Sequence, residues 1–271
     1  MFNQGMAQKA TENLRHVRER KPLVHNITNY VVMNYTANAL LACGASPVMA
    51  HAAEEVEEMV SLAGALVLNI GTLSRTWIQA MLKAGKRANA LHVPVILDPV
   101  GAGATRLRTD SAKRLSDRLS IHVIRGNASE ILSLTGKKSD SQTKGVDSVH
   151  TVDQVTETSV VLAKELRTTL AITGAVDLIT DGERICRVMN GHERMSYVTG
   201  AGCTATVIIG AFLAVDPNPL EAATTALSYF GLAGEKAAAR ALAPGSFQIA
   251  LLDALYEMKE EELRAGAKIQ V

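Results

Sequence analysis

Short, almost wholly apolar runs alternate with longer amphipathic stretches along this chain. The run at residues 65–70 (Ala-Leu-Val-Leu-Asn-Ile) contains a single polar residue, which is typical of a strand covered on both faces. Such strands occur in parallel sheets, because the helices that connect parallel strands cover both sides of the sheet. The alternation therefore predicts an α/β fold with a central, mostly parallel sheet and helices on both faces.

The predicted elements follow this alternation through most of the chain. Strands are expected at residues 23–27, 46–50, 65–70, 94–98, 121–125 and 169–173. Helices are expected within residues 1–20 and at 30–42, 74–91, 110–119, 128–134, 155–166, 204–215, 219–241 and 246–264. Residues 177–181 and 184–189 flank Gly182-Glu183 and predict an antiparallel hairpin. With no repeat and no linker, residues 1–271 are expected to form one domain.

The composition excludes several classes of protein. Hydrophobic residues make up 47% and charged residues 20% of the chain, so a large core is expected rather than disorder. A net charge of +1 without a basic stripe argues against a nucleic-acid partner, and no apolar run is long enough to span a membrane. Three widely spaced cysteines fit neither a disulfide framework nor a zinc site. We expect a cytoplasmic protein.

A glycine-rich turn precedes the apolar run at residues 205–215. Its sequence is Val198-Thr199-Gly200-Ala201-Gly202-Cys203-Thr204. Free N–H groups at the start of a helix bind anions, and Cys203 places a nucleophilic side chain at that point. The segment is therefore a candidate phosphoryl-transfer centre, although a simple turn before a core helix with a buried cysteine would have the same pattern.

Polar residues follow several of the predicted strands, at the edge where open α/β sheets bind ligands. Asp98 could hold Mg²⁺ through its carboxylate or cap the turn that follows it. Arg125 offers a guanidinium fork to phosphate oxygens or could form a surface ion pair. Glu130 has the spacing of a capping box with Asn127 and could also share a magnesium ion with Asp98. Thr173 could place its hydroxyl group near a nucleotide phosphate.

Two histidines and one loop have open roles. His25 and His51 are candidate general bases by residue type, and both could equally be structural. Residues 137–149 are polar and predict an exposed loop, which could be a lid or a simple connection.

Taken together, six segments resemble the hydroxyethylthiazole kinase family of the ribokinase-like superfamily. They follow one another in the family's order and span roughly residues 22–213. The segments are His25-Asn26-Ile27-Thr28-Asn29-Tyr30-Val31, Ala45-Ser46-Pro47-Val48-Met49-Ala50, Leu68-Asn69-Ile70-Gly71-Thr72-Leu73, Leu97-Asp98-Pro99-Val100-Gly101-Ala102, Ile124-Arg125-Gly126-Asn127-Ala128-Ser129-Glu130 and Val198-Thr199-Gly200-Ala201-Gly202-Cys203.

The resemblance implies a ribokinase-like fold and an activity. The implied reaction is ATP- and Mg²⁺-dependent phosphorylation of the hydroxyl group of 4-methyl-5-(2-hydroxyethyl)thiazole, a step of thiamine salvage. The implied site residues are Met49, Gly200 and Asn29 for the alcohol, Arg125, Thr173 and Gly202 for ATP, and Asp98 and Glu130 for Mg²⁺. A homotrimer with active sites at subunit contacts is also implied.

Cys203 separates this chain from other ribokinase-like enzymes, which have an aspartate base at that position. Because a helix start lowers the pKa of a thiol, we expect Cys203 to orient the alcohol and to accept its proton weakly, without a covalent phosphoenzyme. Most of the rate would come from positioning and charge stabilisation by the N–H groups of residues 200–203, Arg125 and Mg²⁺.

Two other functions are weighed against this one. A kinase of the same fold could act on hydroxymethylpyrimidine or a pyridoxal-type alcohol, but Cys203 and the segment at residues 25–29 argue against it. A protein that binds thiazole or nucleotide only as a sensor would not need Asp98, Arg125, Glu130 and Cys203 together.

Overall fold

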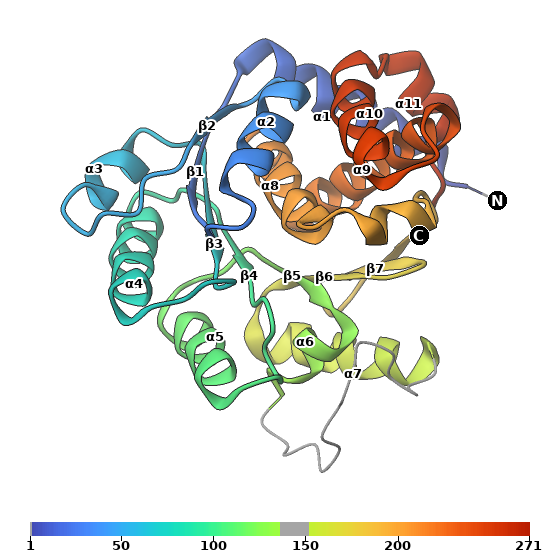
Figure 1. Cartoon of the computed structure of the whole chain (residues 1–271). Helices are drawn as coiled ribbons and strands as arrows, with labels where there is room; N and C mark the ends of the chain where they lie inside the picture. The colour runs from blue at the N-terminus through green and yellow to red at the C-terminus, as the bar shows by residue number, and fades with distance from the viewer. Residues whose placement is uncertain (1, 136–151) are drawn as a thin grey trace.

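The computed structural model describes residues 2–135 and 152–271, in which nine strands form one sheet (Figure 1). The strand order is β2-β1-β3-β4-β5-β6-β7-β8-β9. Neighbouring strands from β2 to β6 are parallel, and β7, β8 and β9 continue the sheet in antiparallel pairs. The strands are β1 (Leu23–Ile27), β2 (Ser46–Val48), β3 (Ala65–Asn69), β4 (Val95–Asp98), β5 (Val123–Asn127), β6 (Thr169–Thr173), β7 (Asp177–Thr180), β8 (Ile185–Val188) and β9 (Ile269–Gln270). The predicted mostly parallel sheet and the hairpin are confirmed.

Helices cover both faces of this sheet, as Figure 1 shows. One face carries α1 (Gln4–Arg20), α2 (Met33–Cys43), α8 (Ala201–Leu213), α9 (Pro219–Arg240), α10 (Pro244–Glu257) and α11 (Glu260–Gly266). The other carries α3 (Val56–Ser61), α4 (Arg75–Ala90), α5 (Arg106–Arg118), α6 (Ala128–Leu132) and α7 (Val152–Leu166). A short 3₁₀ helix, η1 (Glu193–Tyr197), precedes α8.

Strand alternation divides the apolar side chains between two cores. Val67 and Ile96 belong to the core under α8, whereas Leu66, Leu68 and Leu97 belong to the core under α4 and α5. Because successive side chains of a strand point to opposite faces, the last residues of β3 and β4 point toward α8. This parity decides on which side of the sheet a site can form.

Several boundaries differ from the sequence-based expectation. The helix expected at residues 30–42 begins only at Met33, because the Asn29 side-chain oxygen accepts hydrogen bonds from the N–H groups of Val31 and Val32 and holds them in a turn. The prediction of a single helix at residues 246–264 was wrong. Met258 leaves the helical conformation, and the Glu262 carboxylate accepts from Lys259 N–H at 2.9 Å to start α11.

Three short elements, α3, η1 and β9, were not predicted. β9 has two residues and exists because Ile269 pairs with Val188 across the sheet edge, a contact without a local sequence signal. The loop expected at residues 137–149 lies outside the described residues. Among the helices of the described part of the chain, none combines the length and the apolar composition needed to cross a membrane.

Candidate active site

A row of polar side chains lies under the start of α8, at or near the carboxyl ends of neighbouring strands. Asn69 and Asp98 are paired in register at the ends of β3 and β4. Thr173 ends β6, whereas Arg125 lies in the middle of β5, which continues to Asn127 and not to the expected end at residue 125. The side chains of all four point toward α8. Residues two positions apart on a strand point to the same face, and the core on the α8 side contains the residue two positions earlier on each strand: Val67, Ile96, Val123 and Ala171. The four positions therefore converge by topology.

The start of α8 approaches this row closely. Gly200 is the N-cap residue and has a φ of 86°, a left-handed conformation that glycine adopts without strain. A Cβ at this position would lie 2.5 Å from Val32 Cγ1. No side chain caps the helix, and among the described residues the N–H groups of Gly202 and Cys203 have no hydrogen-bond acceptor. These donors are free for an anion.

The sulfur of Cys203 is held by two side-chain amides. Asn69 Nδ2 lies 3.2 Å and Asn29 Nδ2 3.6 Å from Cys203 Sγ. Burial and the nearby Asp98 carboxylate raise the pKa of the Cys203 thiol to about 12. The expectation that the helix start would lower this pKa was wrong, because the loss of solvation outweighs the favourable contacts.

Asp98 is fully buried and strongly hydrogen-bonded on one side. Its Oδ2 accepts from Asn69 Nδ2 at 2.9 Å and from Thr206 Oγ1 at 2.7 Å, with Arg125 Nη1 at 3.7 Å. These bonds reach across the sheet rather than to the turn that follows. Asp98 Oδ1 has no partner. Burial raises the pKa of this carboxyl group to about 6 despite the opposing charge of Arg125.

Glu130 forms the predicted capping box and one further bond. Its Oε2 accepts from Asn127 N–H at 2.9 Å, while the Asn127 side chain accepts from Glu130 N–H. Its Oε1 accepts from Gly101 N–H at 2.8 Å, in the turn after β4. Glu130 therefore ties the loops after β4 and β5 together.

The carboxylates of Asp98 and Glu130 fit a magnesium ion by their chemistry. Asp98 Oδ1 is unpartnered, and each Glu130 oxygen retains a lone pair beyond its single backbone bond. The described residues contain no cluster of three or more His, Cys, Asp or Glu side chains that could hold a metal. Two carboxylates are enough to hold Mg²⁺ in a protein, because water and phosphate oxygens complete its coordination.

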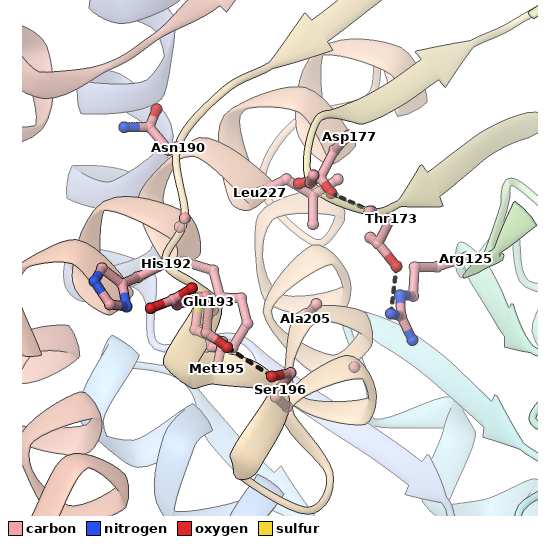
Figure 2. A pocket seen from close by; sticks show the side chains of 17 residues that line it. Arg125, Thr173, Asp177, Asn190, His192, Glu193, Met195, Ser196, Ala205 and Leu227 are labelled. Carbon is pink, nitrogen blue, oxygen red and sulfur yellow. Dashed lines mark hydrogen bonds between the residues drawn. The ribbon is translucent and has the colours of Figure 1, made fainter. Parts of the chain in front are cut away.

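A cavity of about 540 Å³ opens beside Arg125 and Thr173 (Figure 2). One end is formed by Arg125, Thr173 and Gly202, and Arg125 Nη2 donates to Thr173 Oγ1 at 2.5 Å. A Cβ on Gly202 would lie 2.6 Å from Arg125 Nη1, so the glycine makes room for the guanidinium group. The lining also includes the apolar side chains of Leu227 and Phe230. A ligand with an anionic group and an apolar ring would match this lining.

The residues predicted for the alcohol lie at the same edge of the sheet. Met49 is half-buried and directly follows β2, which pairs with β1 just before Asn29. His25 Nε2 lies 2.7 Å from the Ala50 carbonyl oxygen, and burial lowers the pKa of its imidazole. His51 packs against Trp77 with ring centroids 4.7 Å apart. Both histidines make structural contacts, and neither lines the cavity.

Three residues at the site were not among those predicted. Asn69 is the single polar residue in an otherwise apolar strand, a signal visible in the sequence. Thr206 lies one helical turn after Cys203, so it shares the face of α8 that meets Asp98. Asp177 lines the cavity from β7, and only the sheet order places it there.

Comparison with known proteins agrees with this geometry. A family model described as hydroxyethylthiazole kinase family matches residues 14–261. The chain belongs to the hydroxyethylthiazole kinase family. It is 61% identical over 261 residues to a hydroxyethylthiazole kinase of Desulfotalea psychrophila, covering 96% of this chain and 95% of that protein. A hydroxyethylthiazole kinase of Desulfosudis oleivorans is 53% identical over 270 residues, covering 100% and 98%.

Comparison with solved structures identifies the fold of this chain. The hydroxyethylthiazole kinase protein from Pyrococcus horikoshii OT3 has a TM-score of 0.89 and 49% identity, covering 96% of this chain and 98% of that one. A ribokinase-like superfamily protein from Enterococcus faecalis has a TM-score of 0.65 at 14% identity, covering 95% of each chain. The latter likeness concerns the fold alone and confirms the predicted ribokinase-like architecture.

Proposed function

We propose that this chain is an ATP- and Mg²⁺-dependent kinase that phosphorylates the hydroxyl group of 4-methyl-5-(2-hydroxyethyl)thiazole in thiamine salvage. The observation that carries the proposal is the 61% identity, over nearly the whole chain, to a protein named hydroxyethylthiazole kinase. The site supports it independently, because free helix N–H groups, the Arg125 guanidinium group and the Asp98 carboxylate lie near the Cys203 thiol, and the Glu130 carboxylate follows β5. These are the groups that phosphoryl transfer requires.

The reaction forms a bond between the alcohol oxygen and the γ-phosphorus of ATP and breaks the bond from that phosphorus to the β–γ bridging oxygen. ADP leaves, and the alcohol loses its proton. The N–H groups of Gly202 and Cys203 would face the oxygens of the transferred group, and Arg125 with Thr173 would hold the adjacent phosphates. When bound, Mg²⁺ supplies charge neutralisation on those phosphates, with Asp98 and Glu130 as its protein ligands.

Cys203 is proposed to orient the alcohol rather than to act as a strong base. A thiol whose pKa lies near 12 is protonated at neutral pH, and its sulfur already accepts from Asn69 and Asn29. A loose transition state demands little deprotonation of the attacking alcohol, so the alcohol proton can pass to an oxygen of the transferred phosphoryl group or to water, and the protonated thiol need not accept it. Cys203→Ser and Cys203→Asp separate the two roles. Undiminished turnover of the serine variant would remove the base role, and an active aspartate variant would support proton acceptance.

The alcohol pocket is proposed to include Met49, Asn29 and Gly200, and to be completed by a neighbouring subunit of a homotrimer. Its position at the open edge of the sheet supports this, since β2 is the edge strand. Tyr30 and Val31, next to Asn29, are 66% and 65% exposed, and exposed apolar side chains mark interaction surfaces. Mass measurement of the native protein by light scattering tests the trimer.

We further propose that residues 1–271 form one catalytic domain and that the protein is cytoplasmic. One continuous sheet supports a single domain, and three free cysteines, two of them buried, suit a reducing compartment.

The experiment that tests the function is ADP release from Mg-ATP by the purified protein. Hydroxyethylthiazole and hydroxymethylpyrimidine are offered separately, with and without EDTA, and Asp98→Asn serves as the impaired control. Thiazole-dependent turnover that EDTA abolishes is the expected result. Turnover with the pyrimidine alone would overturn the proposed substrate. Nucleotide binding without turnover on either alcohol would favour a sensor.

A further inference from the structure

Asp177 lines the same cavity as Arg125 and Thr173. It is the first residue of β7, and the strand order places β7 one strand beyond β6 and two beyond β5. Ile179, two residues later on the same strand, belongs to the core under α8 and α9, so Asp177 points to the same side of the sheet as Thr173. Figure 2 shows its carboxylate beside Leu227, facing the cavity.

One oxygen of this carboxylate is used and the other is not. Oδ1 accepts from Gly174 N–H at 3.0 Å and so holds the turn between β6 and β7. Oδ2 accepts no hydrogen bond from any described residue, although Asp177 is only 9% exposed. Burial raises the pKa of the carboxyl group to about 7, with the Gly174 bond and Arg125 opposing. This oxygen is not one of the fully buried atoms that lack a partner among the described residues, so a donor that enters the cavity, such as a ligand hydroxyl group or water, can reach it.

The position of Asp177 indicates which part of a nucleotide it would meet. Neighbouring strands lie about 4.8 Å apart, so Asp177 is about one strand spacing from Thr173 and about two from Arg125. A carboxylate repels phosphate oxygens and accepts from hydroxyl groups. In a nucleoside triphosphate, the ribose hydroxyls follow the phosphates along the molecule, as Asp177 lies one strand beyond Thr173, beside Leu227 (Figure 2).

We propose that Asp177 Oδ2 accepts a hydrogen bond from a ribose hydroxyl of the nucleotide and thereby selects ribonucleotides over deoxyribonucleotides. The inference rests on the proposed function, since it takes the cavity to be the nucleotide site. Asp177 is then a specificity-determining residue of the nucleotide donor. It also keeps Gly174, and with it Thr173, in place for the phosphates.

The test is calorimetric titration of the whole protein with ADP, 2′-deoxy-ADP and 3′-deoxy-ADP, each with Mg²⁺ and with EDTA. A hydrogen bond to a charged acceptor predicts that ADP binds about ten-fold or more tightly than at least one deoxy analogue. In Asp177→Ala the three affinities should converge, and in Asp177→Asn the ratio should fall without vanishing. Asp181→Asn is the matched control, because Asp181 holds the turn of the same hairpin through Glu183 and Arg184 N–H groups.

Each other outcome has a distinct meaning. Equal affinities of the wild-type protein for ADP and both deoxy analogues would overturn the ribose assignment while leaving the nucleotide site intact. A preference that depends on Asp177 only when Mg²⁺ is present would assign the carboxylate to a metal ion and overturn it as well. Absence of ADP binding in a folded protein would contradict the proposed function itself.

Discussion

The side-chain nitrogen of Asn69 lies 3.2 Å from the sulfur of Cys203 and 2.9 Å from the carboxylate of Asp98. One amide thus connects the first turn of α8 to the end of β4. Both acceptors are buried or half-buried, so the bonds are made in a region of low dielectric where an unmade bond is costly.

Replacement of Asn69 by leucine should impair both stability and turnover. Removal of the amide leaves Asp98 with one fewer donor, which should lower the free energy of unfolding by about 1–3 kcal/mol. Loss of the sulfur contact should lower kcat more than it raises the KM for ATP, because Arg125 and Thr173 remain in place. Urea unfolding and steady-state kinetics measure the two effects. Asn38→Leu, at an exposed position on α2, is the control and should change neither. An unchanged kcat for Asn69→Leu would contradict this role.

Replacement of Gly202 by alanine should weaken nucleotide binding through Arg125. The added Cβ would lie 2.6 Å from Arg125 Nη1, so the guanidinium group must move away from Thr173. We expect ADP affinity to fall about ten-fold, the loss of roughly one charged hydrogen bond, with little loss of stability because alanine favours a helix. Gly245→Ala on α10 is the matched control, since a Cβ there has no atom within 4 Å. Equal ADP affinity in both variants would contradict the argument.

Alkylation of Cys203 by iodoacetamide should be slow at neutral pH. With a pKa near 12, the thiolate fraction at pH 8 is on the order of 1 in 10⁴, about a thousand-fold below that of an unperturbed cysteine. The rate should rise steadily up to pH 9.5 without a plateau. Peptide mass spectrometry separates Cys203 from the buried Cys43 and Cys186. A plateau near pH 7 would indicate a low pKa and restore a thiolate base.

Replacement of Glu130 by glutamine should reveal two separable roles. The neutral side chain can accept one of the two backbone bonds but not both, so we expect a loss of about 1 kcal/mol in metal-free unfolding. The Mg²⁺ concentration that gives half-maximal turnover should rise separately. Glu262→Gln, in the capping box of α11, is the matched control and should change stability alone. If Glu130→Gln leaves the Mg²⁺ requirement unchanged, Glu130 is purely structural.

Asp177 should make the protein less stable as the pH rises from about 4 to 7. Its folded pKa of about 7 lies above the ordinary value of 3.8, so in this interval the native state keeps a proton that the unfolded state has lost. Its contribution to stability is complete below pH 3.8 and is lost as pH rises through 7. One proton corresponds to a slope of up to about 1.4 kcal/mol per pH unit. Asp177→Asn should flatten the slope between pH 6 and 7, measured by urea unfolding at each pH. An equal slope in both proteins would show that the pKa of Asp177 does not lie near 7.

Much of the architecture was predictable from local patterns. Apolar runs such as residues 65–70 and the capping box at Asn127 and Glu130 carry their structure in nearby residues, and both were confirmed. The resemblance to the hydroxyethylthiazole kinase family was likewise present in collinear segments and was confirmed by the match over residues 14–261. The roles of Met49 and Asn29 toward the alcohol stay predictions.

The sequence by itself determined the α/β class, the family and the strand-end positions of Asp98 and Thr173, because hydrophobic periodicity and short motifs are local properties. Only the tertiary structure decided that Asn69 and Thr206 bond Asp98, that Asp177 enters the cavity, and that the Cys203 pKa is raised. These features depend on sheet order and on burial, which are sums over residues distant in the chain. A helix start alone favours a thiolate, but the desolvation that opposes it exists only once α8 has packed onto the sheet.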